Sequence, residues 1–163
     1  MRKTKIVGEF GEIFVAQTMQ NLGFEVDRLD AEGIDLAAYA KDGQKYGISV
    51  KSRCIQDKPN DSINLTYNDL TYTYEQAKMI RDLEPAYAFI VHSNNRIDLL
   101  IATQDYICQH YLGITSIVEY QNTFTSKKDA GSTKSFNISL KSREKWRALQ
   151  DNGIIYSATL SLK

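Results

Sequence analysis

The sequence predicts an α/β fold in which helices flank a mixed central sheet. Apolar residues recur with helical spacing over residues 8–24, and three short segments with strand character follow directly. A second helical segment over 73–83 leads into further strands, so the order is a helix, a three-strand meander, a helix and another strand. That order is typical of a layered α/β domain, and 163 residues are enough for one such domain with a hydrophobic core.

The first helix is predicted from an apolar stripe with a period near 3.6 residues. Gly23 is expected to end it, because glycine readily takes the left-handed conformation that follows many helices. The stripe consists of Phe10, Ile13, Phe14, Met19 and Leu22.

Three strands are predicted over 24–30, 34–40 and 45–53. The last two are joined by "KDGQ", whose Asp-Gly pair marks a hairpin turn. Counting from this turn places Asp35 roughly across from Lys51, with both side chains on one face of the sheet.

The rest of the chain is predicted to alternate between loops, helices and strands, with a β-α-β tail. Thr73 and Gln76 have the spacing of a capping box at the start of the second helix, and Pro85 is expected to end it. Residues 56–71 are polar and rich in turn-forming types, which predicts a surface loop. The later elements are strands over 86–93 and 96–103, a helix over 103–113, a loop over 122–135, a strand over 135–140 and a helix over 142–153.

Composition excludes several classes of function. The net charge is zero, so the chain has no overall basic field for nucleic acid, although local patches can still supply one. No apolar run is long enough to span a membrane. Two distant cysteines, Cys54 and Cys108, form no metal-binding spacing and fit buried thiols in the reducing cytoplasm, where we expect the protein to be located. Motifs for nucleotide binding, zinc proteolysis and serine hydrolysis are absent from the sequence.

Charged residues in the first half of the chain can form a metal-dependent site. Glu9 and Glu12 lie three residues apart on one face of the first helix, beside two glycines that allow close approach of another backbone. A carboxylate from this helix and Asp35 from the hairpin can converge on one cation, and such hard oxygen ligands suit Mg²⁺. A lysine beside the ion, Lys51, can stabilise charge on a phosphate or orient the attacking water.

Three segments carry a resemblance to a known family: "GEFGEIFVAQTMQNLGFEV", then "GIDL", then "ISVKSR". Together they resemble the PD-(D/E)XK nuclease superfamily, in particular the branch with archaeal Holliday-junction resolvases and related restriction-type endonucleases. The resemblance implies a restriction-endonuclease-like αβββαβ core over about residues 6–112 and a β-α-β extension over about 113–163. It further implies a Mg²⁺- or Mn²⁺-dependent hydrolase that cleaves DNA, and it allows a homodimer.

The resemblance also assigns roles to individual residues. The catalytic set falls on Glu12, Asp35 and Lys51, with Glu9 as a substitute for Glu12. The metal ligands fall on Glu12, Asp35, Ser49 and the backbone carbonyl of Val50. Ser49 departs from the family pattern, which has Glu or Gln two residues before the lysine.

A hydroxyl in place of a carboxylate weakens the expected metal site. Glu75, at the start of the second helix, is a candidate for a displaced carboxylate, although the preference for acidic residues near helix N-termini explains it equally well.

A basic segment near the C-terminus is a candidate nucleic-acid surface. Residues 124–147 contain seven Lys and Arg against Asp129 and Glu144, a net charge of +5. Contacts to phosphates from this segment would make binding salt-dependent, whereas an ordinary solvated surface would not. The predicted contacts are Lys127, Lys128, Lys134, Lys141 and Arg143.

Three hypotheses therefore stay open. The first is a Mg²⁺-dependent DNA endonuclease, which the set Glu12, Asp35 and Lys51 favours. The second is a catalytically inactive nuclease-like domain that binds nucleic acid or a protein partner, which Ser49 and the zero net charge favour. The third is a plain α/β domain in which Asp35 and Lys51 form a structural ion pair. Whether the three charged side chains converge in space discriminates best among these hypotheses.

Overall fold

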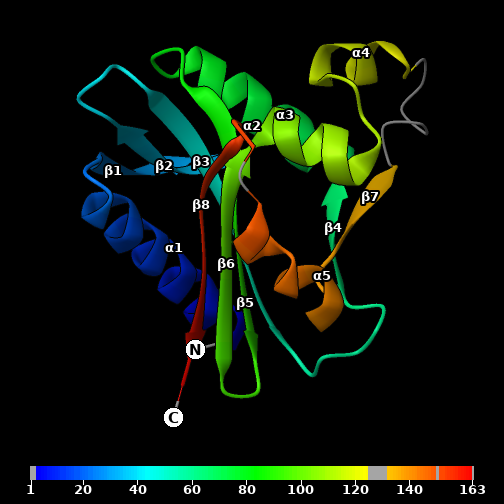
Figure 1. Cartoon of the computed structure of the whole chain (residues 1–163). Helices are drawn as coiled ribbons and strands as arrows, with labels where there is room; N and C mark the ends of the chain where they lie inside the picture. The colour runs from blue at the N-terminus through cyan, green and yellow to red at the C-terminus, as the bar shows by residue number, and fades with distance from the viewer. Residues whose placement is uncertain (1–2, 125–131, 150, 163) are drawn as a thin grey trace.

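The computed structural model describes residues 3–124, 132–149 and 151–162, and it confirms the predicted mixed α/β fold (Figure 1). The predicted αβββαβ order is present, with one additional strand, β4, between the meander and the second helix. These elements are α1 (Lys3–Asn21), β1 (Glu25–Ala31), β2 (Ile34–Tyr39), β3 (Lys45–Ile55), β4 (Ser62–Thr66), α2 (Tyr67–Met79) and β5 (Glu84–Ser93). They are followed by β6 (Arg96–Thr103), α3 (Gln104–Ile107), the π-helix η1 (Cys108–Leu112), α4 (Ile117–Asn122), β7 (Thr133–Asn137), α5 (Leu140–Glu144), the 3-10 helix η3 (Trp146–Ala148) and β8 (Ile154–Ser161).

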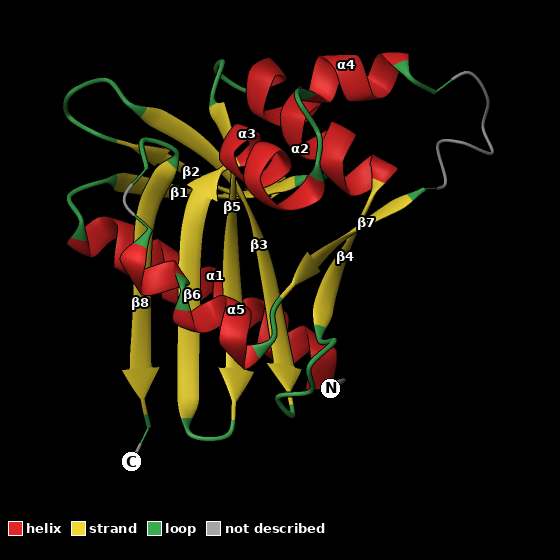
Figure 2. Ribbon diagram, turned by 45° about the vertical axis from the view of Figure 1, so that its right-hand side comes forward, coloured by secondary structure: helices red, strands yellow, loops and turns green. Residues whose placement is uncertain are grey.

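The main sheet has six strands in the order β1-β2-β3-β5-β6-β8. Only β3 and β5 are parallel, so the sheet is mixed, as predicted. Figure 2 shows α1 behind this sheet and α2, α3 and α5 in front of it. The C-terminal β-α-β extension is divided between two sheets, since β8 joins β6 in the main sheet while β7 pairs with β4 in a separate two-stranded sheet. No described helix is both long and apolar enough to cross a membrane.

Side chains alternate between the two faces of the sheet and form separate cores. On the α1 face, Leu36 and Ile48 pack with Val15 and Met19 of the helix. On the α2 face, the largest core contains aromatic residues of β5 and buried residues of β4, α2, α3 and β7. The two faces therefore present different surroundings to the strands that carry the candidate site.

The beginning of α2 differs from the prediction. Residues 56–71 were expected to form a loop, but Ile63 and Leu65 alternate inward as a buried strand, and α2 begins directly after it. The helix is capped by Thr66, whose side chain accepts from the backbone N–H of Asp69 while the Asp69 carboxylate accepts from the backbone N–H of Thr66. The predicted Thr73 cap was therefore wrong by two turns.

The register of the β2–β3 hairpin also differs from the prediction. Leu36 lies opposite Ile48 and Tyr39 lies opposite Lys45, while Ala40 donates its backbone N–H to the carbonyl of Gln44 across the turn. Continuing this register by one residue places Asp35 beside Ser49, two residues before Lys51. The predicted pairing of Asp35 with Lys51 was wrong because Ala40 and Gln44 close the hairpin around a three-residue loop, 41–43, which shifts the register by two residues from the predicted one.

Candidate functional site

Asp35 lies where β2 and β3 separate. The β2–β3 ladder ends at Leu36 and Ile48, and beyond it Asp35 Oδ2 accepts a hydrogen bond of 2.7 Å from the backbone N–H of Val50. The regular alternation of side chains between the two faces of the sheet breaks at the same place. Ile34 packs on the α2 face, while Leu36, two residues later, packs on the α1 face. The N–H and C=O groups of one strand residue point to the same edge, so the Val50 carbonyl also faces the gap that Asp35 occupies.

A half-open cavity of about 380 Å³ lies beside Asp35 on the α2 face of the sheet. Its walls come from the turn before β2, the middle of β3 and the first turns of α2. The residues that line it are Glu32, Gly33, Asp35, Ser49, Val50, Lys51, Asn68, Asp69, Tyr72 and Thr73. Four sequence-predicted residues, Asp35, Ser49, Val50 and Lys51, are thus brought to one cavity.

Close packing of α2 against the turn before β2 holds this cavity together. Thr73 donates its hydroxyl to the carbonyl of Gly33 at 2.9 Å. A Cβ atom at Gly33 would lie only 2.6 Å from the backbone of Tyr72, and the φ angle of Gly33 is +91°. Both features require glycine at this position, and together they fix the distance between α2 and the strand that carries Asp35.

Asp69 is a cavity residue that the sequence analysis missed. Its Oδ1 atom lies 3.5 Å from the Lys51 ammonium, and its Oδ2 atom accepts from the backbone N–H of Thr66 at 2.9 Å. Burial opposes ionisation, but the Thr66 N–H and the charge of Lys51 outweigh it and lower the pKa of Asp69. The Thr-x-x-Asp spacing at Thr66 was a signal for the helix start and for an acidic residue in its first turn.

Asp35 has the opposite electrostatic character. Burial raises its pKa, the hydrogen bond from Val50 counteracts this, the charge of Glu12 raises the pKa further, and Lys51 and Arg28 lower it again. The net direction is upward, so Asp35 is a carboxylate whose negative charge is incompletely compensated. Among the described residues Lys51 pairs with Asp69 rather than with Asp35, so the hypothesis of a structural Asp35–Lys51 ion pair was wrong.

Glu12 lies on the other face of the sheet, close enough for its charge to act on Asp35. Its Oε2 atom is 2.9 Å from the guanidinium of Arg28 on β1, and their side chains are 29% and 56% exposed. Glu12 does not line the cavity on the α2 face. Glu9, its predicted substitute, is exposed one turn earlier on α1. Arg28, a cation that the sequence did not single out, thus lies on this face near enough for its charge to lower the pKa of Asp35.

The displaced carboxylate predicted at Glu75 lies away from this cavity. Glu75 is exposed and accepts a hydrogen bond from the side chain of Gln121 on α4 at 3.0 Å. Asp69, earlier on the same helix, is the acidic residue that lies beside Lys51.

Two of the predicted phosphate contacts, Lys127 and Lys128, lie outside the described residues. Lys141 is exposed, and the ammonium of Lys134 lies 5.9 Å from the centre of the Tyr120 ring.

The two cysteines differ in burial. Cys54 is exposed, although it was predicted to be buried. Cys108 is buried, and burial raises the pKa of its thiol to about 12.

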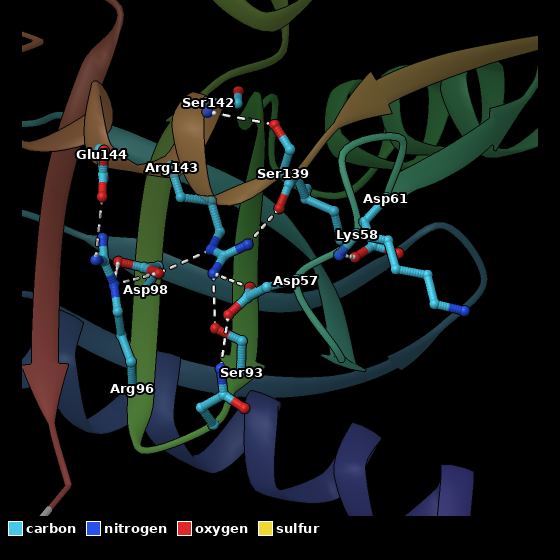
Figure 3. A network of polar contacts seen from close by, with 12 residues as sticks. Asp57, Lys58, Asp61, Ser93, Arg96, Asp98, Ser139, Ser142, Arg143 and Glu144 are labelled. Carbon is cyan, nitrogen blue, oxygen red and sulfur yellow. Dashed lines mark hydrogen bonds and ion pairs between the residues drawn. The ribbon is translucent and has the colours of Figure 1, made fainter.

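Arg143 was wrongly predicted to contact nucleic acid. Its side chain is fully buried, and Figure 3 shows its guanidinium enclosed by polar partners. Arg143 donates to Asp98 at 2.8 Å, to Asp57 at 2.7 Å and to Ser93 at 2.7 Å. It also donates to the carbonyl of Ile138. These partners occupy its hydrogen-bonding groups, so Arg143 joins α5 to the central sheet and has no free face for a phosphate.

The donor set around Asp35 fits a weak divalent-ion site. Asp35 has a second carboxylate oxygen, the Val50 carbonyl faces the same gap, and Asp69 is on the cavity wall. Mg²⁺ commonly binds one or two carboxylates and completes its octahedral shell with waters and substrate phosphates. Over residues 3–124, 132–149 and 151–162, no group of three or more His, Cys, Asp or Glu side chains is close enough to hold an ion alone. A site here therefore needs oxygen atoms from the backbone and from a substrate.

Comparisons with protein-family models and with curated proteins found no match. Among solved structures, the chain is similar to Hjc of Archaeoglobus fulgidus, described as a Holliday junction resolvase from an archaeal hyperthermophile. The TM-score is 0.49 and the sequence identity is 12%, over 84% of this chain and 87% of the other.

Proposed function

We propose that this protein is a metal-dependent endonuclease that hydrolyses phosphodiester bonds in DNA. One observation carries the proposal: Asp35, the Val50 backbone, Lys51 and Asp69 meet in one cavity at a break in the sheet. An incompletely compensated carboxylate beside a lysine is the arrangement that a divalent ion and a phosphate would complete. DNA as the substrate, a cytoplasmic location and a homodimer stay predictions of the sequence.

Each residue has a defined part in the proposed mechanism. Asp35 and the Val50 carbonyl would hold a divalent ion, Asp69 would assist from α2, and Glu12 would assist from α1. A bound divalent ion supplies Lewis-acid polarisation of the phosphoryl oxygen and acidifies a water molecule. Lys51 Nζ donates to the phosphate as negative charge develops on it, or orients the attacking water. Ser49 is 3% exposed on the cavity wall, where its hydroxyl adds at most a weak neutral ligand.

Plasmid nicking with a titrated metal ion tests this proposal, together with calorimetric Mn²⁺ binding on the same proteins. Asp35→Asn should lower nicking roughly 100-fold or more, since even partners one layer outside metal ligands typically contribute 10- to 100-fold. Lys51→Met should retain Mn²⁺ binding but lose nicking. Lys78→Met is the matched control. Lys78 is also ion-paired to an aspartate, but it lies in the last turn of α2, outside the cavity. Equal losses in Lys51→Met and Lys78→Met would contradict the role of Lys51.

Ser49→Glu separates an active enzyme from an inactive nuclease-like domain. A carboxylate at this position would add a charged oxygen beside Asp35, so Mn²⁺ affinity and nicking should both increase, and Asp35→Ala in the same protein should abolish both gains. The inactive-domain hypothesis becomes the better one if wild type and Ser49→Glu both bind DNA without cleaving it. If Ser49→Glu binds no more metal than wild type, residue 49 does not face an ion.

A further inference from the structure

Tyr72 is the one aromatic side chain among the described residues that line the cavity beside Asp35. It is 36% exposed, so burial in the core does not explain this large ring. Within the described part of the chain, no aromatic ring or cation stacks on Tyr72, and its hydroxyl makes no hydrogen bond. Tyr72 is therefore an unpartnered ring on the cavity wall.

The other two tyrosines of α2 are packed inside the protein. The ring of Tyr67 lies edge-on to that of Phe124, with centres 4.6 Å apart, and it also contacts Tyr120. Tyr74 packs against the largest core on the same face of the sheet. These two rings hold α2 in place, whereas Tyr72 is directed away from the core and toward the cavity.

Local geometry brings the ring of Tyr72 to the charged part of the cavity. A Cβ atom at Gly33 would lie 2.8 Å from the Cβ of Tyr72, so the base of this side chain is seated against the turn before β2. Aromatic side chains in helices lean back toward the N-terminus, over the residues three and four positions earlier. For Tyr72 these are Asp69 and Asn68, and Asp69 lies 3.5 Å from the Lys51 ammonium. The ring and the ammonium thus border the same part of the cavity.

Resting on the proposed function, we propose that Tyr72 is a stacking platform for an unpaired nucleobase beside the scissile phosphate. Lys51 contacts the phosphate, and the base of the adjoining nucleotide lies on the Tyr72 ring. Bases inside a duplex already stack on their neighbours, so only a base that has left the stack can offer its face to a side chain. The preferred substrate is therefore DNA with an unpaired nucleotide at the cleavage site, not continuous duplex.

The cavity and the chemistry of stacking both suit this substrate class. A volume of about 380 Å³ lies in the range of sites that enclose small organic groups, so there is room for one base. Stacking on an aromatic ring contributes about 5- to 150-fold in affinity for each base, and it tolerates any sequence because every base has a π-face. Tyr72 should thus select the unpaired state of a nucleotide and not its identity.

The experiment compares two short duplexes, one fully paired and one with a single bulged 2-aminopurine. Phosphorothioate linkages prevent cleavage, so fluorescence anisotropy can measure binding both in EDTA and with Mn²⁺. Wild type should prefer the bulged duplex by about 5- to 150-fold. The preference should persist at higher salt, because the two duplexes present nearly the same phosphates. Tyr72→Phe keeps the ring and should retain the preference, whereas Tyr72→Leu should bind both duplexes almost equally.

Quenching of 2-aminopurine reports stacking directly. Its fluorescence should fall when the bulged duplex binds to wild type or Tyr72→Phe, and should stay high with Tyr72→Leu. Tyr156→Leu is the matched control, because Tyr156 is also a half-buried tyrosine that lines a groove, but on the α1 face of the sheet. It should behave like wild type in both measurements.

The outcomes separate this inference from the proposed function. The inference is overturned if wild type binds DNA but Tyr72→Leu keeps the wild-type preference and quenching, or if wild type binds both duplexes equally. In either case the proposed endonuclease stands, since plasmid nicking does not depend on that preference. If wild type binds neither duplex and nicks no plasmid, the proposed function fails and the role of Tyr72 fails with it.

Discussion

Asp35 and Asp98 are both aspartates of the central sheet, but the fold compensates their charges in opposite ways. Asp98 is fully buried and accepts from Arg96, Arg143 and Thr159 at 2.7–2.9 Å. Burial alone would raise the pKa of Asp98, yet these donors outweigh it and lower the pKa. Asp35 is half-buried and, among the residues that the structure describes, accepts one hydrogen bond, from the neutral N–H of Val50, and its pKa is raised. The chain therefore can satisfy a buried carboxylate completely, and at Asp35 it does not.

The difference distinguishes a structural charge from a candidate binding charge. The network around Asp98 joins β6, α5, β8 and the loop after β3 through ion pairs and hydrogen bonds (Figure 3). Asp35 instead lies at the edge of a cavity, and its second carboxylate oxygen accepts from no donor in the described part of the chain. Perturbed carboxylates cluster at functional sites because an incoming ligand supplies the missing compensation.

The largest expected effect comes from removing the fully compensated charge, that of Asp98. Asp98→Asn should lower the free energy of unfolding by roughly 3–5 kcal/mol, because it leaves the buried Arg143 guanidinium without its fully buried counter-charge. Urea denaturation measures this loss. Asp82→Asn is the control, since its side chain is 80% exposed and should change the unfolding free energy by no more than about 0.5 kcal/mol. A loss below 1 kcal/mol for Asp98→Asn would show that Asp57 alone compensates Arg143.

The next effect concerns metal ions. At a Mg²⁺ concentration about 100 times the dissociation constant, binding should stabilise wild type by about 2.7 kcal/mol. Asp35→Asn should lose this gain, because Asp35 is the central proposed ligand, whereas the metal-dependent gain of Asp98→Asn should equal that of wild type. Thermal unfolding with Mg²⁺ and with EDTA measures the gain for each protein. Identical gains in wild type and Asp35→Asn would place any Mg²⁺ site elsewhere.

The sequence predicted much of the local structure and less of what depends on distant partners. The Asp-Gly turn and the apolar alternation correctly brought Asp35 and the residues 49–51 together, because a hairpin joins segments adjacent in sequence. Asp69 and Arg28 reach the site through tertiary packing, which no local pattern encodes. Arg143 resembled a surface cation because its partners Asp57 and Asp98 lie 86 and 45 residues away along the chain.

A smaller effect on stability is expected from removing the incompletely compensated charge, that of Asp35. Without metal, Asp35→Asn should be slightly more stable than wild type, because the amide oxygen can still accept from Val50 while the poorly compensated charge is removed. The expected increase in Tm is at most about 4 °C, since 1 kcal/mol corresponds to about 2–4 °C in a chain of this size. Differential scanning calorimetry in EDTA measures it. A decrease in Tm would mean that the Asp35 charge stabilises the fold.

The smallest effect concerns the pH range over which ionisation of each aspartate changes the stability of the fold. The pKa of Asp35 is raised above its ordinary value of 3.8, so the folded protein binds this proton more tightly than the unfolded chain. Ionised Asp35 therefore destabilises the fold, and the advantage of Asp35→Asn should shrink as pH falls toward 3.8. The pKa of Asp98 is lowered from 3.8, so its stabilisation is present above that value and should be lost only as pH falls below it.

Urea midpoints from about pH 2 to pH 7 in EDTA separate the two ranges, because each variant is compared with wild type at every pH. Asp35→Asn should converge on wild type from above, at pH values higher than 3.8, since protonated Asp35 is neutral like the amide. Asp98→Asn should converge on wild type from below, at pH values lower than 3.8, since the Arg143 partner is neutralised only there. Opposite signs in separate pH ranges follow from one fully compensated charge and one incompletely compensated charge. If both differences changed over the same range with the same sign, the two aspartates would be equally compensated, and Asp35 would lose its distinction as a site for a cation.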